Sequence, residues 1–275
     1  MVLEFHKMHG AGNDFVLIDA RGQPLDLDAE MAARMADRHR GIGCDQILVL
    51  READDAACVL RYEIWNADGS PAAQCGNGAR CVGLFLGRAG ETGDEPFRLE
   101  SPSGVVAIRR CRDGEYEVEM GRPEFEPSRV PLSLEPEDGR YVLDSPWGPL
   151  EFGAVSMGNP HALVLVDAIS TADITNLGAA ISSDPAFPQG CNAGFAEITD
   201  RKNIYLRVFE RGAAETSACG SGACAAVSIL RRANMVDETV RVTQRGGNLT
   251  ISWTGGRDSV IMAGPATYVY KGIFE

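Results

Sequence analysis

The chain has 275 residues, of which 44% are hydrophobic, and its formal net charge is −13 with a pI near 4.8. This length allows one large or two medium domains whose cores need no crosslinks. An acidic chain repels phosphate backbones, so we expect no nucleic-acid partner. The strongest apolar stretches, 47–50 and 162–166, are too short to span a bilayer. With no signal-peptide pattern, we expect a cytoplasmic protein without a membrane partner.

Short apolar runs rich in β-branched residues alternate with turn signals, which is typical of strands. In chain order the predicted strands are 15–20, 47–50, 59–65, 104–110, 115–120, 162–168, 203–209, 239–244 and 249–253. Helices are predicted at 28–40, with Asp28 as N-cap, at 76–88, more weakly at 171–181, and at 220–233. The pattern favours an α+β fold in which mixed sheets surround a few buried helices.

A proline-rich stretch, 121–140, lies near the middle of the chain and indicates a domain boundary close to its start. We therefore expect an N-terminal half at 1–119 and a C-terminal half at 120–264. The final strand, 265–275, is expected to return to the first half.

One short phrase occurs twice, as CGNGARC at 75–81 and CGSGAC at 219–224. Each copy precedes an apolar helical pattern and follows a strand that ends nine residues earlier, at Asn66 or Glu210. Polar features upstream recur in the same order: Gly12-Asn13 and Gly158-Asn159, then Gln46 and Asn192. This register predicts two similarly folded halves that supply equivalent groups to one cleft.

A cysteine at a helix start lies beside unpaired backbone N–H groups, an environment that favours thiolate. The glycines let an anion approach those N–H groups closely. The loops lack the Lys-Ser/Thr of a nucleotide P-loop, so a carboxylate is a better ligand than phosphate. Two such loops, with Cys75 and Cys219 on opposite sides of one carbon, predict removal and return of a proton without a cofactor.

The other six cysteines are interpreted as buried, reduced residues: Cys44, Cys58, Cys81, Cys111, Cys191 and Cys224. No C-x-x-C pair is present, and the spacings 75/81 and 219/224 do not place two sulfurs on one helix face, so no metal site is expected. The histidines at 6, 9 and 39 are interpreted as structural.

At these motifs the chain strongly resembles the diaminopimelate epimerase family. The matching segments are KMHGAGNDF (7–15), ADRHRGIGCDQ (36–46), NADGSPAAQCGNGARC (66–81), MGRPEFEP (120–127), VSMGNPH (155–161), CNAGF (191–195), ERGAAETSACGSGACAA (210–226) and GPATYVY (264–270). The resemblance implies interconversion of LL- and meso-diaminopimelate, for lysine and peptidoglycan synthesis, by two cysteines. It also implies two pseudo-symmetric domains, each a mixed sheet rolled around a central helix, and a homodimer.

Site residues follow from the resemblance position by position. Cys75 and Cys219 correspond to the two acid/base cysteines. The implied substrate contacts are Asn13, Gln46, Asn66, Gly76, Asn77, Asn159, Asn192, Glu210, Arg211, Gly220 and Ser221. His161 and Glu210 correspond to residues that tune the thiols, and Tyr270 to a dimer contact. Ala214 replaces a glycine common in the family, which would add strain if that position requires a positive φ.

Three alternatives remain open from the residues alone. A proline racemase or hydroxyproline epimerase also uses a cysteine pair, in different surrounding motifs. A thiol hydrolase would need only one of Cys75 and Cys219, paired with His161. A non-catalytic anion-binding module would tolerate replacement of either cysteine by Ala.

Overall fold

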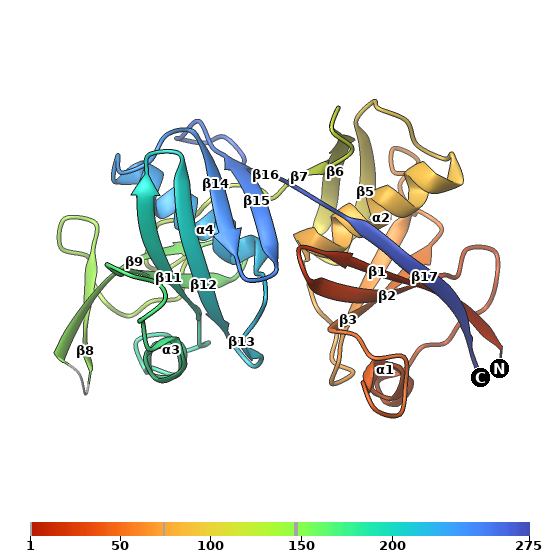
Figure 1. Ribbon diagram of the computed structural model, residues 1–275, viewed down its shortest axis with the longest axis horizontal. Helices are drawn as coiled ribbons and strands as arrows, with labels where there is room; N and C mark the ends of the chain where they lie inside the picture. Colours follow the sequence, from red (N-terminus) through yellow and green to blue (C-terminus); the bar gives the residue numbers. More distant parts are fainter. Residues whose placement is uncertain (1, 74, 146–147) are drawn as a thin grey trace. The chain divides into compact units, whose positions relative to one another are not determined.

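The computed structural model describes residues 2–73, 75–145 and 148–275, and the chain divides into two compact units (Figure 1). Unit 1 comprises Met1–Glu119 and Ala263–Glu275, and unit 2 comprises Met120–Met262. Within the described residues, no helix is both long and apolar enough to cross a membrane.

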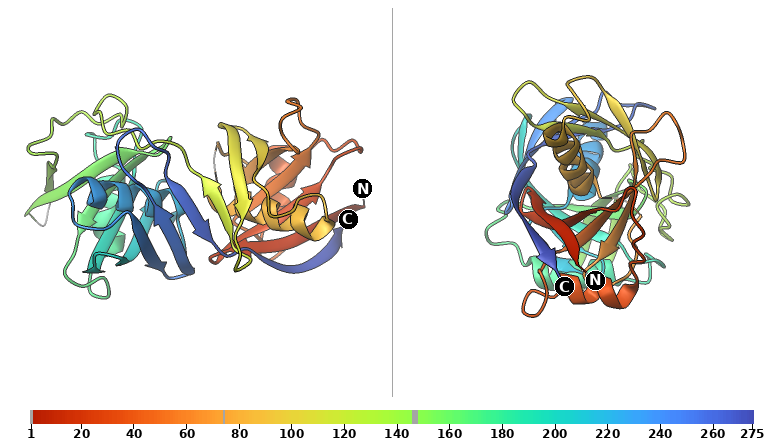
Figure 2. Two further views of the ribbon diagram at one scale, coloured as in Figure 1. Left: turned by 90° about the horizontal axis from the view of Figure 1, so that it is seen from above. Right: turned by 90° about the vertical axis from the view of Figure 1, so that its right-hand side faces the viewer.

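Unit 1 is one sheet in which the last strand of the chain lies beside the first (Figures 1 and 2). Its sheet order is β17-β1-β2-β3-β4-β5-β6-β7, parallel at β2–β3 and β4–β5 and antiparallel elsewhere. The elements are β1 (Leu3–Gly10), β2 (Asn13–Asp19), α1 (Ala29–Ala36), β3 (Gln46–Arg51), β4 (Arg61–Asn66), α2 (Gly76–Ala89), β5 (Phe97–Ser101), β6 (Gly104–Arg110), β7 (Tyr116–Glu119) and β17 (Thr267–Phe274).

Unit 2 repeats this order of elements. Its sheet runs β8-β9-β10-β11-β12-β14-β15, parallel at β10–β11 and β12–β14 and antiparallel elsewhere. The elements are β8 (Tyr141–Ser145), β9 (Gly148–Ser156), β10 (Pro160–Leu165), α3 (Ile174–Ser182), β11 (Asn192–Asp200), β12 (Asn203–Glu210), β13 (Ala214–Glu215), α4 (Gly220–Arg232), β14 (Thr239–Gln244), β15 (Gly247–Ser252) and β16 (Ile261–Gly264). The predicted mixed-sheet α+β class is confirmed.

One helix in each unit is buried against the sheet. Helix α2 packs on strands β1, β2, β6, β7 and β17, and α4 packs on β9 to β12 and β15. Glycines on α2 allow this close approach: a Cβ at Gly83 would lie 2.9 Å from Cδ1 of Tyr116, and one at Gly87 would lie 2.6 Å from its Oη. These glycines therefore let α2 lie close against the sheet of unit 1.

Helix α1 is shorter than the predicted range 28–40. Asp28 is its N-cap, as predicted, and accepts the backbone N–H of Met31 at 2.8 Å. The helix ends at Ala36 because the carboxylate of Asp37 accepts the backbone N–H groups of His39 and Arg40, which folds those residues into a turn.

Candidate active site

Cys75 is the N-cap residue of α2. Its backbone is extended, with φ −149°, and its Sγ accepts the N–H of Gly78 at 3.4 Å. The thiol lies 3.6 Å from Oδ1 of Asn13 and can donate its hydrogen to that oxygen. The side chain is half-buried. It therefore combines partial exposure with a position beside the backbone N–H groups of a helix start.

Cys219 caps α4 with the same geometry. Its Sγ accepts the N–H of Gly222 at 3.4 Å and lies 3.6 Å from Oγ of Ser221. Its backbone is held by the buried side chain of Gln244, whose Oε1 accepts the Cys219 N–H at 2.8 Å and whose Nε2 donates to the Cys219 carbonyl at 3.4 Å. The repeated sequence thus forms the same cysteine-capped helix start in both units.

The two thiols differ in their surroundings. Cys219 is buried, and burial raises its pKa well above the ordinary range. The neighbouring Glu210 carboxylate raises it further, against smaller opposing contributions from Ser221 and the Gly222 N–H. The sequence-based expectation that a helix start favours thiolate does not hold for Cys219, because burial and the Glu210 carboxylate raise its pKa by more than the Ser221 and Gly222 hydrogen bonds lower it.

The amide residues of unit 1 lie where strands β2, β3 and β4 begin or end. Asn13 begins β2 after a two-residue turn in which Ala11 and Gly12 both have positive φ, at 52° and 83°. Gln46 begins β3 and pairs directly with Asn66 at the end of β4, and its Nε2 donates to Asn66 Oδ1 at 2.9 Å. Asn13, Gln46 and Asn66 therefore lie at the same end of the sheet. At this end, the Asn13 side chain contacts Cys75, the N-cap of α2.

Gly76 and Asn77 form the first turn of α2, and both are buried. Nδ2 of Asn77 donates to Oδ1 of Asn13 at 3.2 Å. Gly220 and Ser221 hold the corresponding places in α4. The backbone N–H groups of these two turns suit a carboxylate ligand.

The polar residues of unit 2 gather in an equivalent way. His161 pairs with Asn192 across β10–β11, and its Nε2 donates to Oδ1 of Asn159 at 3.0 Å. Oδ1 of Asn192 accepts the backbone N–H of Arg211 at 3.0 Å, and Glu210 accepts a hydrogen bond from Thr216. The strand ends thus bring together His161 and four predicted contact residues, Asn159, Asn192, Glu210 and Arg211.

His161 is buried, and its environment keeps it neutral. Burial lowers its pKa from the ordinary 6.5 to about 3, and the nearby Arg211 charge acts in the same direction. Because Asn159 Oδ1 can only accept, the proton is on Nε2 and Nδ1 is left as an acceptor.

Tyr270 lies on β17, opposite Lys7 of β1, with its ring edge against Phe5 at 6.0 Å between centroids. Its side chain is 45% exposed. It belongs to the outer strand of unit 1 rather than to the cysteine loop. Ala214, on β13, has φ 57°, so the position does require a positive φ, the condition under which alanine is expected to add strain.

Sequence reasoning missed three residues that form hydrogen bonds with predicted site residues. Gln244 clamps the backbone of Cys219, Asp45 accepts from the Asn13 amide at 3.0 Å, and the fully buried Arg80 donates to Asn77 at 2.9 Å. The contacts of Gln244 and Asp45 join distant parts of the chain, whereas Arg80 and Asn77 lie three residues apart on α2. The quoted segments 36–46 and 75–81 contain Asp45 and Arg80 but do not indicate these contacts.

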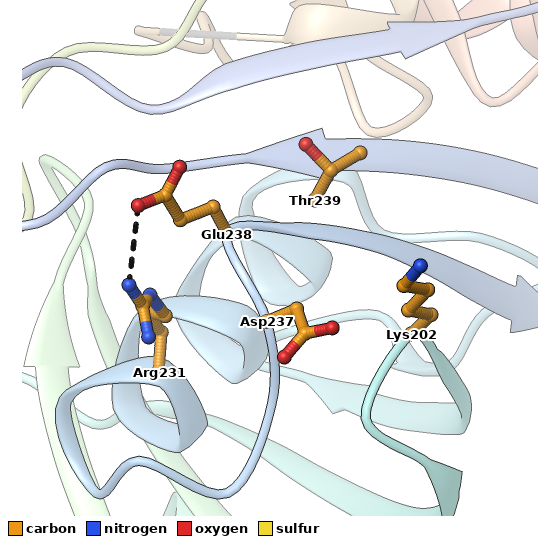
Figure 3. Close-up of a pocket in the computed structure, with 5 residues that line it drawn as sticks. All are labelled: Lys202, Arg231, Asp237, Glu238 and Thr239. Carbon is orange, nitrogen blue, oxygen red and sulfur yellow. Dashed lines mark hydrogen bonds and ion pairs between the residues drawn. The ribbon is translucent and has the colours of Figure 1, made fainter.

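A hollow of about 410 Å³ in unit 2 is lined by Lys202, Arg231, Asp237, Glu238 and Thr239 (Figure 3). An ion pair of 3.3 Å joins Arg231 to Glu238. Arg231 lies in the last turn of α4, whereas Cys219 caps its first. At 1.5 Å per residue these ends are roughly 18 Å apart, so the hollow is distinct from the cysteine loop.

The chain is similar to known proteins over nearly its whole length. The family model for diaminopimelate epimerase matches residues 5–126 and 153–269, which include both cysteine loops. The chain is 47% identical to the diaminopimelate epimerase of Xanthomonas campestris pv. campestris over 271 residues, covering 98% of this chain and 95% of the relative. It is 45% identical to that of Thioalkalivibrio sulfidiphilus, covering both chains completely.

The chain belongs to the diaminopimelate epimerase family.

Among solved structures, a hydroxyproline epimerase from Agrobacterium vitis with bound trans-4-hydroxy-L-proline superposes with a TM-score of 0.73. It is 17% identical, and the match covers 99% of this chain and 91% of that one. At that identity the likeness shows a shared fold. The fold of the diaminopimelate epimerase family therefore extends to enzymes named for other amino acids.

Proposed function

We propose that this chain is a cofactor-independent epimerase that interconverts LL- and meso-diaminopimelate by proton transfer at the α-carbon. One observation carries the proposal: each unit presents a cysteine as the N-cap of a buried helix, in the same hydrogen-bonded geometry. Membership of the family supplies the substrate.

In the proposed reaction, the thiolate of one cysteine removes the α-proton while the thiol of the other delivers a proton to the opposite face. The carbon changes configuration, and the two sulfurs exchange protonation states. Backbone N–H groups at Gly76-Asn77 and Gly220-Ser221 would bind the α-carboxylate and stabilise the charge that develops on deprotonation.

The second amino-acid end of the substrate needs its own ligands. Arg211 can bind a carboxylate in bidentate fashion, and Glu210 can pair with an ammonium group. Asn13, Gln46, Asn66, Asn159 and Asn192 carry both donors and acceptors, which suits an amino-acid end that presents both. Glu210 also contacts Cys219, so it would accept the thiol proton as that cysteine becomes a base. The neutral His161 would act as a hydrogen-bond acceptor through Nδ1.

The test is turnover of LL-diaminopimelate in heavy water with a reductant present. We expect deuterium at the α-position of the meso product, and near-complete loss of turnover in Cys75→Ala and in Cys219→Ala. Cys111→Ala, which removes another partly buried thiol, is the matched control and should retain activity. Substantial turnover by either single variant would refute the two-base reaction. Conversion of proline instead of diaminopimelate would favour the proline racemase alternative.

We also propose a homodimer formed through β17, in the cytoplasm, where the thiol pair would stay reduced. Val269, Tyr270 and Ile273 are 52%, 45% and 63% exposed, an unusual amount of apolar surface for one strand. Light scattering on Tyr270→Lys should show a smaller mass than the parent chain, whereas equal masses would exclude this interface.

A further inference from the structure

A chain of side-chain hydrogen bonds passes Cys75 in unit 1. A guanidinium nitrogen of the buried Arg80 donates to Oδ1 of Asn77 at 2.9 Å. Nδ2 of Asn77 donates to Oδ1 of Asn13 at 3.2 Å, and Nδ2 of Asn13 donates to Oδ2 of Asp45 at 3.0 Å. In this series of hydrogen bonds, every donor therefore points from Arg80 toward Asp45.

The groups at the two ends of this series of hydrogen bonds, the Arg80 guanidinium and the Asp45 carboxylate, fix that direction. A guanidinium can only donate and an ionised carboxylate can only accept, whereas a side-chain amide has one donating and one accepting end. Reversing Asn77 would turn its amide hydrogens toward Arg80, and reversing Asn13 would turn its oxygen toward Asp45. Both reversals place like groups together, so Asn13 presents Oδ1, at 3.6 Å, to the thiol of Cys75.

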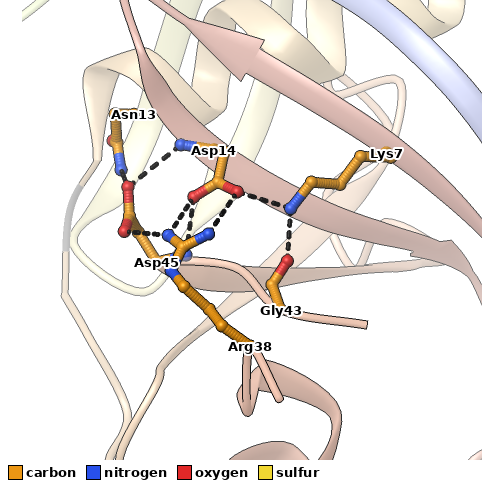
Figure 4. A network of polar contacts seen from close by, with 6 residues as sticks. All are labelled: Lys7, Asn13, Asp14, Arg38, Gly43 and Asp45. Atoms are coloured by element: carbon orange, nitrogen blue, oxygen red, sulfur yellow. Dashed lines mark hydrogen bonds and ion pairs between the residues drawn. The ribbon is translucent and has the colours of Figure 1, made fainter. Parts of the chain in front are cut away.

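Asp45 is itself held in place by hydrogen bonds that its carboxylate accepts (Figure 4). Its Oδ1 accepts from Arg38 at 2.7 Å, and its Oδ2 accepts the backbone N–H of Asp14 at 3.1 Å. Arg38 also binds the Asp14 carboxylate, which Lys7 contacts from the other side. Burial opposes ionisation of Asp14, but the hydrogen bonds from Arg38 and Lys7 hold its pKa well below the usual range.

We propose that Asp45 is a positioning residue for Cys75: with Arg80 it fixes Asn13 so that Oδ1 accepts the thiol hydrogen and the cysteine rests in its protonated form. A hydrogen bond to the neutral form of a group disfavours its ionisation. Cys75 is then prepared to donate a proton, a role in the reaction that rests on the proposed function. Burial raises the pKa of two neighbours, Tyr62 and Cys81, and the charge of a Cys75 thiolate in turn makes a smaller contribution to each rise.

The test measures the rate at which iodoacetamide alkylates Cys75 as a function of pH. The tryptic peptide 62–80 contains Cys75 as its only cysteine, so mass spectrometry reads this thiol alone. Asp45→Ala removes the carboxylate that accepts from the Asn13 amide. Oδ1 of Asn13 is then no longer held toward the Cys75 thiol. We expect the midpoint of the curve to move to lower pH, with alkylation about three to five times faster below it, the equivalent of one modest hydrogen bond.

Two further variants complete the design. Asp54→Ala removes a carboxylate from an exposed ion pair with Arg61 and should leave the curve unchanged. Asp45→Asn keeps the side-chain shape, but its single oxygen cannot serve both Arg38 and Asn13, so a smaller shift in the same direction is expected. If Asp45→Ala does not fold, Asp45→Asn carries the test. All curves are measured at high salt, which screens the direct electrostatic effect on the thiol of removing one charge.

An unchanged midpoint, or a move to higher pH, would overturn the proposal. Faster alkylation at every pH with the same midpoint would also overturn it, because that result signals greater access only. The readout does not depend on turnover. A shifted midpoint in a chain that fails to epimerise diaminopimelate would support the positioning role and refute the proposed function, and the reverse pair of results would do the opposite.

Discussion

The buried imidazole of His161 should make the stability of unit 2 depend on pH. Its pKa is lowered to about 3 by burial and by the Arg211 charge, whereas an unfolded histidine titrates near 6.5. Between these values the unfolded state binds one proton more than the folded state. Stability contributed by the neutral imidazole is therefore present above pH 6.5 and is lost as the pH falls toward 3.

The magnitude follows from the shift. Each pH unit below 6.5 costs about 1.4 kcal/mol, so between pH 7 and pH 5 the chain should lose about 2 kcal/mol through this residue. The assay is urea unfolding followed by circular dichroism at several pH values. His161→Gln removes the titrating group, so the gap in unfolding free energy between parent and variant should shrink by about 2 kcal/mol as the pH falls to 5.

The control is His39→Gln, which removes an exposed imidazole. The difference in unfolding free energy between this variant and the parent chain should stay constant from pH 7 to pH 5. A gap between parent and His161→Gln that stays constant from pH 7 to pH 5 would refute the reasoning, since the imidazole would then titrate alike in both states.

Three further substitutions test the packing that supports the site. Gly83→Ala should lower the unfolding free energy by about 1 kcal/mol, because a Cβ there would lie 2.9 Å from Tyr116 and the overpacking outweighs the gain in helix propensity. The control is Gly93→Ala, which has open space around it and should leave the unfolding free energy nearly unchanged. Ala214→Gly should raise stability by about 1 kcal/mol in the same urea assay, and a loss would contradict strain at φ 57°. Gln244→Leu should cost about 1–3 kcal/mol and reduce turnover, because a buried N–H at the start of α4 loses its acceptor; full activity would contradict this.

Several strands escaped sequence reasoning for an identifiable reason. Strand β1, LEFHKMHG, mixes charged and apolar residues, and β11, NAGFAEITD, begins with small residues. Neither has the continuous β-branched run that marks an isolated strand, and both are stabilised by neighbours on each side. Strands β5, β8, β9, β13 and β16 were missed as well.

The sequence by itself determined the reaction class, because inversion needs two acid/base groups and the chain carries the same cysteine loop twice in register. It also determined the helix starts, since a capping residue and the glycines after it act over a few positions. The tertiary structure decided what the sequence could not: burial and Glu210 raise the Cys219 pKa, and Asp45 and Arg80 orient the amides beside Cys75. Desolvation and hydrogen-bond direction depend on groups that only the folded sheet brings together.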